Sequence, residues 1–287
     1  MTFDRFIADI ERNGWNVHGV QVYHHGSLLH QWGDVTGIHP IYSATKSVLS
    51  IAAGIAWDEG KLDLNAPVLS YLPPEAVSRM TATQRQAFAP VTLHRLMTMS
   101  VRGFPFRPQG DDWLGFSLAC PLEEPEIPAF AYSNIPAYLT GVALTHAMDM
   151  DAAELIKERI FEPLGITEYR MARCPKGYFY GASGMELSVE SLSKIGLLMA
   201  GGGRFGGQQI VSEAYVKRAT AVQQMNREGG YGYFFWKYRD GFSINGKWKQ
   251  KCYVLPEDEL VICYLSHMEE ETSELKESME RYLLGIE

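Results

Sequence analysis

The sequence has little of several features that mark specialised classes of protein. Its 287 residues hold only four cysteines, Cys120, Cys174, Cys252 and Cys263, and none is spaced as CxxC or as a Cys/His metal site. No apolar run is long enough to cross a bilayer, and the charged first twenty residues lack the apolar core of a signal peptide. No basic cluster offsets the net charge of −8. We therefore expect neither nucleic acid nor a membrane as partner.

The same shortages favour a cytoplasmic globular protein without a cysteine-based metal site. Hydrophobic residues make up 46% of the chain and charged residues 21%, which is typical of such proteins. Cys252 and Cys263 flank a predicted turn at 256–259 and can face each other across a hairpin. Without an export signal we expect two buried free thiols there rather than a disulfide.

The order of the predicted elements indicates the fold class. Helical periodicity marks residues 2–13, 136–148, 152–160, 188–199 and 273–284, and strand-like runs mark 17–23, 28–32, 231–238, 242–255 and 260–266. This order predicts an α+β protein (an α/β sandwich), with one antiparallel sheet flanked by helices and built from both ends of the chain. Residues 1–60 and 178–287 would form that region, residues 61–177 an inserted helical region, and the active site would lie between them.

One segment around residue 43 is the centre of this organisation. Pro40 precedes a predicted buried helix that is apolar nearly all round and closes at Gly60. Ser43 and Lys46 would lie one turn apart on one face near its start. A buried lysine of lowered pKa can take the proton of a serine, and a helix start offers partial positive charge for an oxyanion. The pattern therefore predicts a serine nucleophile with a lysine partner.

Spacing alone favours a simpler interpretation, in which the serine caps the helix and the lysine reaches solvent. The same Ser-x-x-Lys spacing recurs at Ser191/Lys194 and at Ser273/Lys276. Those two pairs belong to an ordinary amphipathic helix and to an acidic tail helix. Only Ser43 combines the spacing with the start of a buried helix.

A second motif, Tyr132-Ser133-Asn134, precedes another predicted helix. A tyrosine can exchange a proton with a serine where cations stabilise its phenolate. An asparagine offers donors and an acceptor to a substrate amide and to a neighbouring lysine. Taken alone, the motif is more typical of a capped turn than of a catalytic element.

Together, Ser43-x-x-Lys46 and Tyr132-x-Asn134 resemble the serine β-lactamase and penicillin-binding-protein superfamily, in its class C β-lactamase, DD-peptidase and esterase branch. The resemblance extends over nearly the whole chain. Further blocks similar to the family, in the right order, are residues 91–100, 131–167, 184–199 and 202–212. It implies catalytic roles for Ser43, Lys46 and Tyr132 and a substrate-binding role for Asn134.

The third family motif, Lys-Thr-Gly or His/Tyr-x-Gly on the edge strand beside the serine, is altered. Counting back from Pro256 places Gly246 to Gln250 at this position. Lys247 would then supply the cation, and the Gln250 N–H would join that of Ser43 as the oxyanion hole. Trp248 and Lys249 replace the usual small residues, which would narrow the cleft. The simpler alternative is an edge strand whose lysines Lys247, Lys249 and Lys251 block aggregation.

The resemblance implies a cofactor-independent serine hydrolase that acts on a small ester or amide through an acyl-enzyme on Ser43. A cytoplasmic chain does not meet peptidoglycan, so esterase or amidase ranks above DD-peptidase, and β-lactamase last. The aromatic stretch 101–131 would suit an apolar acyl group, or would only form the core of a lid. Two alternatives stay open: a binding protein that has lost turnover at the altered 247–249 segment, and an acyltransferase.

Overall fold

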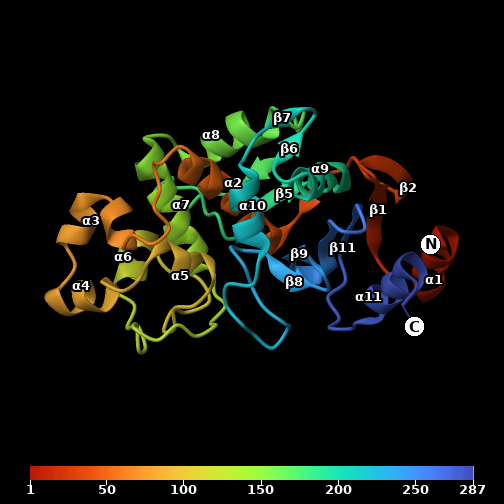
Figure 1. The fold of residues 1–287 in the computed structure, drawn as a ribbon. Helices are drawn as coiled ribbons and strands as arrows, with labels where there is room; N and C mark the ends of the chain where they lie inside the picture. Colours follow the sequence, from red (N-terminus) through yellow and green to blue (C-terminus); the bar gives the residue numbers. More distant parts are fainter. Residues whose placement is uncertain (287) are drawn as a thin grey trace.

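The computed structural model describes residues 1–286, and its centre is a six-stranded antiparallel sheet. Along the sheet the order is β2 (Ser27–Gly33), β1 (Val17–His24), β11 (Leu260–Ser266), β10 (Gln250–Leu255), β9 (Gly241–Gly246) and β8 (Trp236–Tyr238). The pairing of β1 with β11 joins the two ends of the chain. Figure 1 accordingly shows the two termini beside each other. The predicted sheet built from both ends is confirmed.

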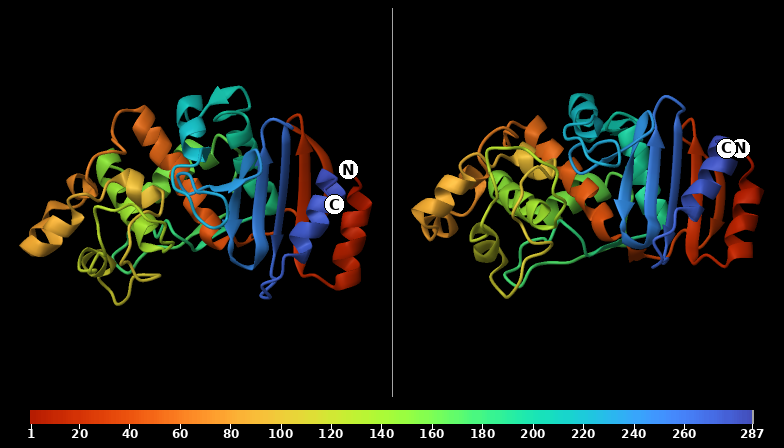
Figure 2. Two further views of the ribbon diagram at one scale, coloured as in Figure 1. Left: turned by 60° about the horizontal axis from the view of Figure 1, so that its bottom comes forward. Right: turned by 90° about the horizontal axis from the view of Figure 1, so that it is seen from below.

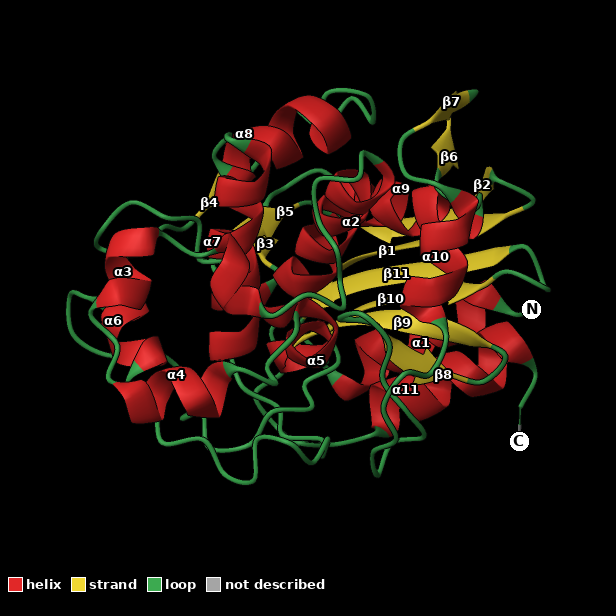
Figure 3. Cartoon of the chain, turned by 60° about the vertical axis from the view of Figure 1, so that its left-hand side comes forward, coloured by secondary structure: helices red, strands yellow, loops and turns green. Residues whose placement is uncertain are grey.

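Helices cover both faces of this sheet, as Figure 3 shows. On one face α1 (Phe3–Asn13), α11 (Glu274–Met279) and the π-helical turn after it, Glu280–Leu284, enclose a core with Phe6, Ile10 and Tyr253. The periodicity of α1 explains this packing, because Phe3, Phe6, Ile7 and Ile10 fall on one side of the helix. On the other face α9 (Val189–Ala200) packs on β1, β10 and β11.

Residues 61–177 form mainly short helices, which lie beyond α2 (Thr45–Asp58) from the sheet (Figure 2). They are α3 (Pro74–Ser78), α4 (Ala82–Phe88), α5 (Leu93–Met97), α6 (Trp113–Leu118), α7 (Ile135–Met148) and α8 (Ala152–Ile156), with 3-10 and π turns at Val68–Tyr71 and Lys157–Phe161. Helix α10 (Glu213–Thr220) packs on α2 from the other side. None of the helices in residues 1–286 has the length and apolar character of a bilayer-spanning helix.

Five short strands complete the fold. β3 (His39–Pro40), β5 (Met185–Leu187) and β4 (Arg170–Met171) form a small sheet, and β6 (Arg204–Phe205) pairs with β7 (Gln208–Gln209). The backbone N–H of Ile41 donates to the Met185 carbonyl at 2.9 Å. The small sheet therefore holds the segment that leads into Ser43.

Two of the predicted strands are wrong. Only residues 236–238 of the predicted strand 231–238 are extended, and the predicted strand 242–255 is two strands, β9 and β10, with a 3-10 turn at Lys247–Lys249 between them. This turn contains no glycine, asparagine or proline, the residues that usually mark turns in a sequence. Trp248 and Lys249 instead adopt the left-handed conformation, with φ of 59° and 67°. Such a conformation costs about 1–2 kcal/mol for a residue with a Cβ atom, so it is not expected at Trp248 or Lys249. The Asn245-Gly246 pair just before them is a hairpin signal that the strand prediction overlooked.

The cysteine prediction is confirmed. Cys252 on β10 lies directly opposite Cys263 on β11, and all four cysteines are buried and free.

Candidate active site

Ser43 lies in a single 3-10 turn, Tyr42–Ala44, that opens into α2. Tyr42 has a φ of 48°, an uncommon conformation for a residue with a side chain. Ser43 is partly exposed, whereas residues 44–56 are buried. The predicted arrangement of a serine at the open start of a buried helix is therefore present.

Lys46, one turn further on, is only 1% exposed and has three partners. Its Nζ lies 3.1 Å from Ser43 Oγ, 2.7 Å from Asn134 Oδ1 and 2.7 Å from the Ala182 carbonyl oxygen. No carboxylate in residues 1–286 forms an ion pair with it. Burial without a counter-charge lowers the pKa of Lys46 to about 7. The amine is therefore substantially neutral near physiological pH.

The three oxygen partners of Lys46 fit both of its protonation states. A neutral lysine has two N–H donors and one lone pair, whereas the ammonium has three donors and no lone pair. The ammonium can donate to all three oxygens, whereas the neutral amine can donate to Asn134 and Ala182 and turn its lone pair to the Ser43 hydroxyl. In its neutral form Lys46 is thus placed to act as a base toward Ser43.

Tyr132 and Asn134, at the start of α7, complete the group from the other side. Lys46 Nζ lies 5.0 Å from the centre of the Tyr132 ring. Burial raises the pKa of Tyr132 to about 12, and a hydrogen bond with Ser43 acts in the opposite direction. Tyr132 is therefore a neutral phenol in contact with the serine hydroxyl. The Asn134 amide bridges Lys46 and Tyr180, whose hydroxyl accepts from Nδ2 at 2.9 Å.

Tyr180 and the Ala182 carbonyl belong to the site but were missed by the sequence analysis. Both come from the segment that follows β4, and no motif marks them. A backbone carbonyl has no sequence signature, and Tyr180 is one of fifteen tyrosines. The Trp113 ring packs edge-on against Tyr180 at 4.9 Å, which fixes its orientation.

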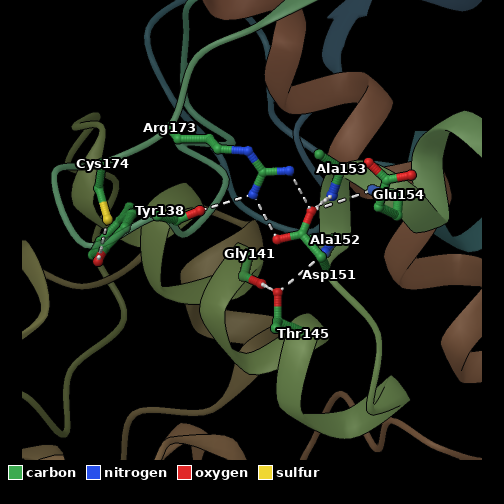
Figure 4. A network of polar contacts seen from close by, with 10 residues as sticks. Tyr138, Gly141, Thr145, Asp151, Ala152, Ala153, Glu154, Arg173 and Cys174 are labelled. Atoms are coloured by element: carbon green, nitrogen blue, oxygen red, sulfur yellow. Dashed lines mark hydrogen bonds and ion pairs between the residues drawn. The ribbon is translucent and has the colours of Figure 1, made fainter.

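A polar network anchors this segment, as Figure 4 shows. Arg173 donates to both carboxylate oxygens of Asp151, at 2.7 and 2.9 Å, and to the Gly177 carbonyl at 2.8 Å. The same carboxylate caps α8 through the N–H groups of Ala153 and Glu154. The network fixes the segment to the end of α7 and the start of α8, and so helps to hold the Ala182 carbonyl in place.

Aromatic side chains enclose Tyr132. The rings of Phe130, Tyr231 and Trp236 lie 6.4, 6.2 and 5.5 Å from it. Phe106 is 61% exposed, while its carbonyl accepts the Asn134 N–H at 2.7 Å. Aromatic residues from 101–131 and from 231–236 therefore surround the polar group formed by Ser43, Lys46, Tyr132 and Asn134.

The segment predicted as the third motif approaches Ser43 in a different form. The Gly246 backbone lies so close to the Ile41 carbonyl that a Cβ atom would stand 2.2 Å from the oxygen. Lys247, one residue on, is exposed, and its Nζ lies 4.5 Å from the centre of the Trp248 ring. The prediction that this segment is an edge strand is corrected here. Residues 247–249 form the turn between β9 and β10, and the edge of the sheet on this side is β8.

Trp248 and Gln250 hold this turn in position. The Trp248 ring packs against Tyr42 at 5.0 Å and against His267 at 4.1 Å. The buried Gln250 side chain bonds both backbone groups of Ser266, at 2.5 and 3.0 Å. Of the four predicted substrate-binding residues, the structure places Asn134 in the polar group and Trp248 against the neighbour of Ser43. Lys247 faces solvent, and the Gln250 side chain is bonded to Ser266 on β11.

The two other Ser-x-x-Lys pairs have no comparable surroundings. Ser191 accepts a hydrogen bond from the capping residue Ser188, while Lys194 forms an ion pair with Glu190 at 2.9 Å. Ser273 is exposed and donates to Glu277. Burial and neighbours, not spacing, distinguish Ser43.

An antiparallel sheet covered by helices on both faces, with a serine–lysine pair at the start of a buried helix, defines the beta-lactamase/transpeptidase-like class of fold. A family model described as Beta-lactamase matches residues 7–284, so the chain belongs to the beta-lactamase family. Members of this family are generally serine hydrolases. No curated protein matches the chain.

Solved structures show the same fold at low identity. A protein described as a 6-aminohexanoate-dimer hydrolase from Bacillus anthracis has a TM-score of 0.80 at 17% identity, over 97% of this chain and 80% of the other. A protein described as a beta-lactamase from Bacteroides dorei reaches 0.79 at 18% identity, with 98% of each chain covered. A beta-lactamase/D-alanine carboxypeptidase from Pseudomonas syringae reaches 0.76 at 15% identity, over 99% and 98%. The predicted fold class and family are thus confirmed.

Proposed function

We propose that the protein is a serine hydrolase that cleaves a carboxylic ester or amide through an acyl-enzyme on Ser43. The observation that carries this proposal is the environment of Lys46, a buried amine of lowered pKa with two carbonyl acceptors and the Ser43 hydroxyl at 3.1 Å. A lysine kept only for stability would not need to be buried without a counter-charge beside a serine.

In the proposed reaction the neutral Lys46 amine takes the Ser43 proton as Oγ attacks the carbonyl carbon. The tetrahedral intermediate collapses, and the leaving group receives that proton through the Tyr132 hydroxyl. Lys46 then activates water, which attacks the acyl ester and restores Ser43. A pKa of Tyr132 near 12 fits a phenol that relays a proton better than a phenolate base.

The oxyanion requires N–H donors that are otherwise unused. Within residues 1–286 the Ser43 N–H donates no hydrogen bond, so it is free to bind an oxyanion. The Gln250 N–H as second donor remains a prediction, as do the substrate-binding roles of Lys247 and Trp248. Asn134 uses one of its two amide hydrogens on Tyr180 and keeps the other for a substrate carbonyl.

We propose a class of substrate, small carboxylic esters or amides, and not a single compound. The aromatic lining from Phe106, Phe130 and Trp236 favours an apolar acyl group, and we rank esters and amides above β-lactams. The proteins of similar fold include one described as a 6-aminohexanoate-dimer hydrolase and one described as a beta-lactamase/D-alanine carboxypeptidase, which supports a hydrolase without choosing between an amide and an ester. A cytoplasmic location remains part of the same proposal.

The test is covalent labelling of the purified protein with a fluorophosphonate and with a fluorescent penicillin, followed by peptide mass spectrometry. We expect an adduct on Ser43. Ser43→Ala should abolish it and lower ester or amide turnover by at least about 10⁴-fold. Ser191→Ala is the matched control, because it removes a serine of the same Ser-x-x-Lys spacing outside the site.

Turnover that survives Ser43→Ala would overturn the mechanism. Labelling of Ser43 without turnover would instead support the binding protein that has lost catalysis. Faster product formation on addition of an alcohol or amine acceptor would indicate an acyltransferase.

A further inference from the structure

A second concave site lies between the β9–β10 turn and the segment that leads into α11. Its volume is about 520 Å³. One side carries Lys249 and Lys251, a second side carries Glu270 and Glu271, and Tyr264 and Met268 also line it. The volume lies within the range of small-molecule sites. Trp248, whose ring packs on Tyr42, separates this pocket from the serine turn.

The charges that line this pocket do not neutralise one another. In the described part of the chain neither Lys249 nor Lys251 lies within 4.0 Å of a carboxylate, and neither Glu270 nor Glu271 forms an ion pair. Glu269, the next residue, does pair, with His267 at 3.3 Å. Opposite charges thus stand on two sides of one pocket without meeting.

Of these four charged residues, Lys251 alone lies in a strand of the central sheet. It lies on β10 in register with Asn245 and Tyr264, and it is partly buried, whereas Glu270 and Glu271 are exposed. Burial lowers the pKa of Lys251 to about 8, Lys276 and Lys249 act in the same direction, and Glu228 acts against them. A cation held in this position favours a ligand that brings a negative charge to it.

We propose that this pocket binds a small zwitterion, a molecule with one carboxylate and one ammonium group, as in a free amino acid. The carboxylate contacts Lys249 and Lys251, and the ammonium group contacts Glu270 and Glu271. An anion alone would satisfy the lysines but approach the two glutamates unfavourably. A zwitterion satisfies both sides, which accounts for opposite charges that line one pocket and yet stay unpaired.

Isothermal titration calorimetry of the full chain at pH 7 and constant ionic strength tests this. The probes are glycine and 4-aminobutyrate, which differ in the separation of their charges, with butyrate and butylamine as single-charge comparisons. We expect saturable binding of at least one zwitterion. Each single-charge compound should bind at least about tenfold more weakly, a difference of about 1.4 kcal/mol.

Variants on the two sides of the pocket sharpen the result. Lys251→Met keeps the aliphatic stem, and Glu270→Gln alters an exposed side chain that folding does not need. Each should weaken zwitterion binding at least about tenfold. Lys217→Met is the matched control, because Lys217 pairs with Glu213 on α10, outside the pocket. If Lys251→Met does not fold, Glu270→Gln decides alone.

Three results would overturn the proposal. They are no saturable heat with either zwitterion, binding of butyrate as tight as that of the zwitterions, and zwitterion binding that Glu270→Gln leaves unchanged. Because the readout is binding and not turnover, the result is independent of whether Ser43 proves to be a catalytic nucleophile.

Discussion

The serine–lysine group and the β9–β10 turn are neighbours around Ser43, but they are built in opposite ways. Lys46 and Asn134 are buried and joined by hydrogen bonds, so that each holds the other in place. In the turn, Lys247 is exposed, and Trp248 and Lys249 adopt left-handed conformations that disfavour side chains. The first region has little freedom to vary, whereas the second tolerates local strain. We therefore expect substitutions to affect chemistry in the first region and mainly stability or affinity in the second.

Removing the amine of Lys46 should cause the largest loss of turnover. Lys46→Met keeps the length of the side chain but removes the base, and we expect turnover to fall about 10³-fold. Ester or amide hydrolysis is the measurement, with folding checked by circular dichroism. Lys194→Met, at the matching position of a second Ser-x-x-Lys pair, should change turnover little. Equal losses in the two variants would contradict the assignment of Lys46 as base.

The pH dependence of kcat/KM with a neutral ester reports on the same amine. Protonated Lys46 cannot accept the serine proton, so activity should fall about tenfold per pH unit well below its pKa of about 7 and level off above it. Tyr132, with a pKa of about 12, should cause no decline up to pH 10. A profile that is flat from pH 5 to 9 would show that Lys46 is not the base.

Asn134→Asp should move this profile in a known direction. A carboxylate in place of the amide favours the protonated ammonium and so raises the pKa of Lys46, by about 1–2 units. Activity at pH 7 should drop and partly recover at higher pH. A midpoint that stays in place or moves down would mean that Asn134 does not contact the amine that titrates.

In the β9–β10 turn, Lys247→Gln should change kcat/KM by less than about fivefold. The side chain is exposed, and charge interactions in water contribute little. Steady-state kinetics with a neutral and with an anionic ester provide the measurement. A large loss confined to the anionic ester would restore Lys247 to the substrate-binding role that the sequence suggested.

The smallest expected effect is a gain in stability at Lys249. With φ at 67°, glycine at this position relieves strain, and Lys249→Gly should raise the free energy of unfolding by about 0.5–1 kcal/mol. Urea denaturation measures it. Lys237→Gly on strand β8 is the control and should lower stability, because glycine weakens a strand. Loss of stability in both variants would show that the turn is not strained.

The two regions also differ in how far the sequence predicts them. Ser43 and Lys46 lie close together because helix geometry brings residues three apart to one face, so spacing and burial suffice. The chain path at 247–249 depends instead on Trp248 packing against Tyr42 and His267, contacts between residues distant in sequence. Local patterns contain no record of such contacts. The Ala182 carbonyl was missed for a related reason, since any residue can supply one. The division of the chain at residues 60 and 177 remains a prediction.

The pairing of β1 with β11 has a consequence for the order in which the molecule can form. Residues such as Val20 and Tyr264 are partners across the sheet but are translated at opposite ends of synthesis. If β1 and β2 pair as a hairpin before the end of the chain is made, we expect the edge of β1 that later meets β11 to stay unpaired until then. Closure of that edge ends with the last helices, where the Thr2 N–H donates to the Tyr282 carbonyl at 2.7 Å. Contacts so distant in sequence fold slowly, which makes the nascent chain, more than the finished protein, the species most exposed to aggregation.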